Sequence, residues 1–162
     1  MKTLLILRHA KSSWKDSRLA DFDRPLKKRG KRDAPRMGAL LKQEDLVPDL
    51  IISSSAKRAF ATAEAAASAC DYDSEIRATR QLYGADPDSY IDVLRTVPDG
   101  YQRVMVVGHN PGLESFIEEL TGEWIRMPTA ALAQVNVRVE KWSELSLESP
   151  NELIANWLPK EL

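Results

Sequence analysis

Two histidines and two arginines are the side chains of this sequence best suited to chemistry on an anion. His9 directly follows Arg8 after the apolar run at 2–7, and His109 comes just after the apolar run at 103–107. The chain has no other histidine. An unprotonated imidazole can act as a nucleophile near neutral pH, and a protonated one can donate to an anion. Two histidines in equivalent places after strand-like runs therefore indicate a catalytic pair rather than structural residues.

The two arginines extend this pattern toward phosphate. Arg8 ends an apolar run, where a guanidinium is costly to bury unless an anion or a carboxylate meets it. A buried Arg–Asp pair is the alternative explanation. Arg58 falls in the first turn of an expected helix, where its charge opposes the helix dipole and favours a nearby anion. Because the planar guanidinium suits bidentate contact with phosphate oxygens, the four side chains predict a phosphate pocket.

Strand-like runs alternate with helical stretches in the order that builds a layered α/β domain. Strands are expected at 2–7, 49–53, 75–79 and 103–107, and helices at about 26–43, 56–70, 87–97 and 112–121. Two further strands are expected at 132–139, near a sheet edge, and at 153–158. This order predicts one three-layer α/β/α domain over residues 1–162, with a mostly parallel sheet. Ligands bind such sheets beyond the carboxyl ends of the strands, which is where the histidines fall.

Composition and charge limit the classes of partner. The chain has 162 residues, 43% of them hydrophobic, and its single Cys70 cannot form an internal disulfide. Since no signal peptide or membrane-spanning run is visible, we expect a cytoplasmic protein with no membrane partner. Residues 1–42 hold 13 Lys and Arg against 4 Asp and Glu, whereas the remainder holds 10 against 20. That asymmetry can steer an anion to one end of the molecule, or it can reflect solvated helix faces.

The basic run at 27–32 is of a kind that also binds nucleic acid. It lies on an expected helix and contains no aromatic residue. We therefore expect no nucleic-acid partner. Docking of an acidic protein partner is the alternative role for this run.

The segments around the four residues resemble the histidine phosphatase superfamily, in its usual order. They are Leu5–Ala10 (LILRHA), Ser54–Ala59 (SSAKRA) and Val107–Gly112 (VGHNPG). Shorter motifs are similar to those of the SixA-type phosphohistidine phosphatases: Arg8–Ser12 (RHAKS), Arg24–Leu26 (RPL), Arg29–Gly30, Val107–Glu114 (VGHNPGLE) and Met127–Ala130 (MPTA). The match runs in order from about residue 3 to residue 131.

The resemblance implies a phosphoglycerate-mutase-like fold and a mechanism that needs no metal or cofactor. It makes His9 the nucleophile, which forms a phosphohistidine intermediate that water then hydrolyses. The other ring nitrogen of His9 then needs a hydrogen-bond acceptor, usually a backbone carbonyl. Arg8, Arg58 and a protonated His109 would bind the phosphoryl oxygens. Phosphate, sulfate or vanadate would be bound there as well.

Residues just after the nucleophile are weaker candidates for the pocket. Lys11, Ser12 and Arg18 are expected to line its mouth and to contact substrate, although Arg18 also fits an ordinary surface loop.

Two departures from the family pattern bear on the substrate. Ala10 stands where many members carry glycine, and no obvious equivalent is present for the glutamate that protonates an alkoxide leaving group. Asp86 and Asp88 are candidates for that acid, but each also fits a cap at a helix start, and a partner could supply the acid instead. A pocket without a dedicated acid suits a P–N bond better than a P–O bond.

These observations lead to one main hypothesis and two alternatives. The main hypothesis is a metal-independent phosphatase that hydrolyses phosphohistidine on a protein, such as a histidine phosphotransfer domain. One alternative is a phosphatase of the same superfamily that acts on a small phosphate ester. The other is a module that binds phosphorylated partners without turnover. The pair His9 and His109 favours an enzyme, because a binding module needs no nucleophile.

Overall fold

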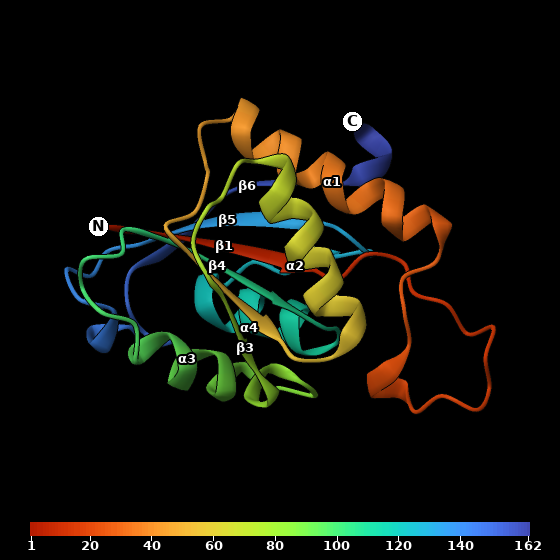
Figure 1. Cartoon of the computed structure of the whole chain (residues 1–162). Helices are drawn as coiled ribbons and strands as arrows, with labels where there is room; N and C mark the ends of the chain where they lie inside the picture. Colours follow the sequence, from red (N-terminus) through yellow and green to blue (C-terminus); the bar gives the residue numbers. More distant parts are fainter.

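Continuous apolar sequence builds the two central strands, which are buried on both faces of a six-stranded sheet. The computed structural model describes residues 1–162 (Figure 1). The strands are β1 (Lys2–Arg8), β2 (Leu50–Ser54), β3 (Ile76–Thr79), β4 (Arg103–Gly108), β5 (Leu132–Val137) and β6 (Asn151–Trp157). The helices are α1 (Lys28–Gln43), α2 (Lys57–Ala69), α3 (Pro87–Arg95) and α4 (Gly112–Thr121), with short 3₁₀ turns η1 (Asp21–Asp23), η2 (Arg80–Leu82), η3 (Trp142–Glu144) and η4 (Pro159–Glu161).

The helices cover both faces of the sheet, as the predicted three-layer architecture requires. In β1, Leu5 and Leu7 pack into the core shared with α1 and α2, whereas Leu4 and Ile6 pack into the core shared with α3 and α4. Figure 1 shows α1 and α2 on one side of the strands and α3 and α4 on the other. Since successive strand residues point to opposite faces, an unbroken apolar strand serves both cores. No helix is long and apolar enough to cross a membrane.

The sheet is mixed, so the prediction of a mostly parallel sheet is corrected. The strand order is β3-β2-β4-β1-β5-β6. The first four strands pair in parallel, but β5 runs antiparallel to both β1 and β6. The reason lies in the segment 122–131, which leads from the end of α4 back to the carboxyl end of β1 without forming a helix. β5 therefore starts at that end of the sheet and must run the opposite way.

Candidate active site

His9 lies at the carboxyl end of β1 and is held by backbone on both sides. Its amide donates to the carbonyl of Gly108 at 3.0 Å, and its own carbonyl accepts from the amide of Ala130 at 3.0 Å. The ring is buried, and Nδ1 lies 2.8 Å from the carbonyl oxygen of Ala10, which supplies the acceptor expected from the sequence. A carbonyl oxygen only accepts, so Nδ1 carries the proton and Nε2 keeps its lone pair. Burial lowers the pKa of His9 to about 3, which leaves the ring neutral at pH 7.

His109 faces His9 from the end of β4. The two ring centroids are 5.1 Å apart, and Nε2 of His109 lies 2.8 Å from Oγ of Ser54 on β2. Burial and the charge of Arg58 lower the pKa of His109 to about 4. With only protein groups around it, His109 is neutral at pH 7, so the protonated form expected from the sequence requires an anion beside it. A bound phosphoryl group opposes both effects, and protonation of His109 is therefore coupled to anion binding.

Arg8 reaches the same space without an ion pair of its own. Its Nη1 donates to the carbonyl oxygen of Met127 at 3.0 Å, and its pKa is lowered by burial, against an opposing effect of the Glu114 charge. Glu114 accepts from the amide of Met127 at 2.7 Å, which fixes the segment that receives Arg8. No carboxylate lies within ion-pair distance of Arg8. The alternative explanation of Arg8 as half of a buried Arg–Asp pair therefore fails.

Arg58, in contrast, is held by Asp21, a residue that the sequence analysis missed. Arg58 donates from Nη1 to the Asp21 carbonyl at 2.7 Å and from Nη2 to its carboxylate at 2.9 Å. The same carboxylate accepts from the Tyr83 hydroxyl at 2.7 Å and from Nε of Arg24 at 3.0 Å. The hydrogen bond from Tyr83, with those from the two arginines, lowers the pKa of Asp21 to about 2. Asp21 is therefore an ionised residue that positions Arg58, and it cannot act as a general acid at pH 7.

Three buried nitrogens of the site have no partner within the protein. They are Nε of Arg8, Nε of Arg58 and Nδ1 of His109. The two arginine nitrogens are donors, and Nδ1 of His109 is a donor when its ring is protonated. Buried polar groups are almost always satisfied, so three without a partner on neighbouring side chains indicate a ligand that accepts hydrogen bonds. A phosphoryl group offers three peripheral oxygens to such donors. No group of three or more His, Cys, Asp or Glu side chains is placed to hold a metal ion. These donors thus fit an anion.

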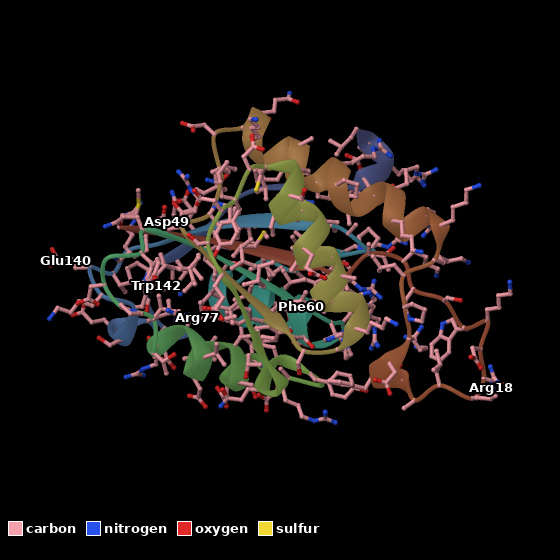
Figure 2. The ribbon with its side chains drawn as sticks, viewed as in Figure 1. Arg18, Asp49, Phe60, Arg77, Glu140 and Trp142 are labelled. Carbon is pink, nitrogen blue, oxygen red and sulfur yellow. The ribbon has the colours of Figure 1, made fainter.

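The remaining predicted pocket residues have other roles. Oγ of Ser12 accepts from Arg24 at 2.7 Å and so orders the loop after the nucleophile. The side chain of Lys11 makes no hydrogen bond or ion pair, although its backbone carbonyl accepts from the amide of Lys27. Arg18 lies in a surface loop, as the alternative expectation had it: its side chain is 89% exposed and pairs with Asp16. Figure 2 shows Arg18 at the outer tip of the loop, because this loop runs outward between Ser13 and Ala20.

The two candidate acids lie at the start of α3. Asp86 is its N-cap, as one reading of the sequence predicted, and its carboxylate accepts from the amide and the hydroxyl of Ser89. These bonds lower the pKa of Asp86, which favours its ionised form. Asp88 lies in the first turn of the helix and makes no hydrogen bond to the site. Asp86, which is held in its ionised form as a helix cap, is therefore not poised to protonate a leaving group.

Replacement of Gly30 by alanine is expected to disturb the loop that follows His9. A Cβ at Gly30 would lie 2.1 Å from the backbone oxygen of Lys11. Helix propensity alone favours alanine by about 1 kcal/mol, but overpacking against backbone costs about 1–3 kcal/mol, and this contact is severe. We expect a net loss of about 2 kcal/mol in the free energy of unfolding. Urea titration measures it, with Gly100→Ala as the control, since nothing lies within 4 Å of a Cβ there. Equal stability of both variants would contradict the packing.

The two neutral histidines make stability depend on pH between 7 and 5. In the unfolded chain both rings titrate near the ordinary pKa of about 6.5. In the folded protein His9 and His109 stay neutral far below that value. As the pH falls, the histidines of the unfolded state become protonated while those of the native state stay neutral. The free energy of unfolding therefore falls by about 2 kcal/mol per histidine between pH 7 and pH 5. Urea titrations of the wild type and of His9→Asn/His109→Asn test this: the variant's stability should be nearly flat over this window. Parallel pH curves would refute the burial of neutral rings.

Comparison with known proteins agrees with this site. The family model for the histidine phosphatase superfamily (branch 1) matches residues 4–83. An uncharacterized protein of Mycobacterium leprae is 31% identical over 95% of this chain and 100% of its own length. The chain therefore belongs to the histidine phosphatase superfamily, which confirms the resemblance found in the sequence and places it in the class of phosphatases.

Solved structures show proteins that resemble it in shape. A SixA protein of Agrobacterium tumefaciens, provisionally named a phosphohistidine phosphatase, is 30% identical and has a TM-score of 0.83 over 98% of both chains. A protein histidine phosphatase SixA complexed with tungstate has a TM-score of 0.85 over 98% of both chains, at 21% identity, which shows the common fold. The chain is thus structurally close to SixA proteins.

Proposed function

We propose that this protein is a metal-independent phosphohistidine phosphatase that acts on a phosphorylated protein through a phosphoenzyme intermediate on His9. The single observation behind the proposal is the arrangement around the ring of His9. Its Nδ1–H donates a hydrogen bond to the Ala10 carbonyl, which leaves Nε2 with a free lone pair. Three nitrogens without a partner in the protein lie on the neighbouring Arg8, Arg58 and His109. A free nucleophile among unused anion donors is what phosphoryl transfer requires.

The reaction then has two steps on one side chain. Solvent first protonates the free ring nitrogen of the substrate phosphohistidine. Nε2 of His9 then attacks phosphorus and forms an N–P bond while the N–P bond of the substrate breaks, so that the substrate leaves as neutral imidazole. Water then attacks the phosphohistidine, releasing inorganic phosphate and restoring His9. The Ala10 carbonyl stabilises the positive charge that the ring gains in the first step. Arg8, Arg58 and His109 bind the phosphoryl oxygens as charge shifts between them.

The carboxylates near the site support a P–N bond as the substrate linkage. Asp21 and Asp86 both have lowered pKa values and are ionised at pH 7. An alkoxide leaving group would need a proton from such an acid, whereas the imidazole of phosphohistidine can leave as the neutral base once protonated. The similarity to SixA proteins supports the same linkage, and tungstate, which one of them binds, is a phosphate-like oxyanion.

The test is dephosphorylation of a histidine phosphotransfer domain phosphorylated on histidine, in excess chelator. The matched substrate is a phosphoserine protein of similar size. We expect chelator-resistant loss of phosphohistidine and little loss of phosphoserine. Mass spectrometry of the substrates and assay of the released phosphate measure both losses. A rate that chelator abolishes would refute metal independence. Activity confined to small phosphate esters would replace the proposal with the phosphomonoesterase alternative, and no turnover on either would favour a binding module.

A further inference from the structure

A second positively charged hollow lies outside the catalytic pocket. It is a cleft of about 550 Å³ between α1, the segment 126–129 and the C-terminal turn η4. Five basic side chains line it: Arg29, Arg32, Arg36, Arg126 and Lys160. We propose that this basic cleft is the docking surface for an acidic face of the phosphorylated protein substrate. This inference rests on the proposed function and names the surface by which the substrate protein is held.

The cleft carries more positive than negative side chains, so part of its positive charge is not neutralised within the protein. Asp33 lies on its floor, is buried, and pairs with Arg32 at 3.3 Å and with Arg36 at 3.4 Å. The other acidic residue of the lining is the exposed Glu161, so five positive charges face two negative ones. Arg36 also donates to the backbone oxygen of Leu162, which ties η4 to α1.

Three of the basic side chains have no partner in the protein. Arg29, Arg126 and Lys160 are exposed and form no ion pair or side-chain hydrogen bond. They come from three separate parts of the chain that the fold brings to one cleft. Their unopposed charge is available to an external carboxylate or phosphate.

The cleft adjoins the catalytic pocket through a shared wall. Thr129 lines the cleft, while its neighbours serve the pocket: the carbonyl of Met127 accepts from Arg8, and the amide of Ala130 donates to the carbonyl of His9. In Figure 1 the C-terminal turn lies against the end of α1 that is nearer the carboxyl ends of the strands. A protein that presents a phosphohistidine to His9 therefore covers this cleft as well.

The form of the cleft favours a protein surface over a small anion. Small-ligand sites enclose most of the ligand and aim a few fixed polar groups at it. Here the unpartnered cations are long, exposed and spread over the rim. Charges of this kind mainly accelerate encounter with an oppositely charged partner and fix its orientation. They would act on KM for a protein substrate and leave the chemical step at His9 unchanged.

The experiment compares a charge-reversed cleft with a matched reversal elsewhere. The test variant is Arg29→Glu/Arg126→Glu/Lys160→Glu, and the control is Arg95→Glu/Arg138→Glu/Lys141→Glu, three exposed cations near the amino end of the sheet. Each is assayed on an acidic histidine phosphotransfer domain phosphorylated on histidine, and on free phosphohistidine. We expect the test variant to lose at least about tenfold in kcat/KM on the protein, through KM, with a smaller loss at high salt. Free phosphohistidine should be hydrolysed at wild-type rate, and the control should behave as wild type on both substrates.

Other results would overturn the inference in distinguishable ways. No loss on the protein would show that the cleft does not dock it. Equal losses of kcat/KM on both substrates would show that the cleft is part of the phosphate site. If tripolyphosphate inhibits the wild type and the control but not the test variant, the cleft is a site for small anions. If the wild type hydrolyses free phosphohistidine but not the protein, docking fails and the site chemistry stands. If it hydrolyses neither, the proposed function itself fails.

Discussion

His9→Ala abolishes turnover of phosphohistidine protein, with an expected fall in rate of at least about 10⁴-fold. The reason is that no second nucleophile can take its place. His109 is the only other histidine, and its Nε2 already lies 2.8 Å from the hydroxyl of Ser54. Its Nδ1 has no partner in the protein, and in the proposed mechanism it donates to a phosphoryl oxygen and does not face phosphorus. Single-turnover phosphate release measures the loss, and the phosphoenzyme band of the wild type should be absent.

The same variant should still bind the anion, which separates loss of the nucleophile from loss of the fold. Arg8, Arg58 and His109 remain in place, so tungstate should raise the melting temperature of both His9→Ala and the wild type by a similar amount. Cys70→Ala is a control of similar size, because this buried thiol lies at the end of α2 and takes no part in the site. Normal turnover by His9→Ala would refute the mechanism.

Arg58→Ala should lower both the rate and the affinity for phosphate or vanadate, each by about 10²-fold or more. Two effects combine. A donor to the phosphoryl oxygens is lost, and the carboxylate of Asp21 loses its closest cation while Tyr83 and Arg24 keep it ionised. The negative charge left beside the pocket then repels the substrate. Arg58→Lys should restore little of the lost rate or phosphate affinity. The planar guanidinium can pair with Asp21 through one edge and donate to phosphate through another, whereas an ammonium group is a single point charge. Phosphate inhibition constants and kcat/KM measure both effects.

A double-mutant cycle with Asp21 isolates the second effect. Asp21→Ala alone should weaken phosphate binding, because Arg58 is no longer held in position. In the Arg58→Ala background the same change removes a repelling charge, so the double variant should bind phosphate more tightly than Arg58→Ala alone. Asp16→Ala is the control, since Asp16 pairs only with the exposed Arg18. Strictly additive losses would show that Asp21 and Arg58 do not act as a pair.

The sequence alone determined where His9 and His109 lie. A strand buried on both faces must be continuously apolar, so β1 and β4 could be recognised, and the residue after each had to lie at the carboxyl edge of the sheet. All eight boundaries of the four helices lie within two residues of the expected ones for a similar reason, because the signals that begin and end a helix are local. At α1 the expected start at 26 was too early, since Leu26 instead forms a bridge with Ser12.

Tertiary structure decided the parts of the site that depend on chain path and burial. The reversal of β5 follows from how the segment 122–131 returns across the sheet, which no local pattern encodes. Asp21 pairs with Arg58 from 37 residues away and accepts a hydrogen bond from Tyr83, 62 residues further along the chain, and neither residue has a distinctive sequence signal. The neutral state of both histidines arises because burial excludes the water that would stabilise a charged ring. Local sequence thus placed His9 and His109 at the carboxyl edge of the sheet, whereas the enclosing fold brought Asp21 and Tyr83 to the site and set the charge of both histidines.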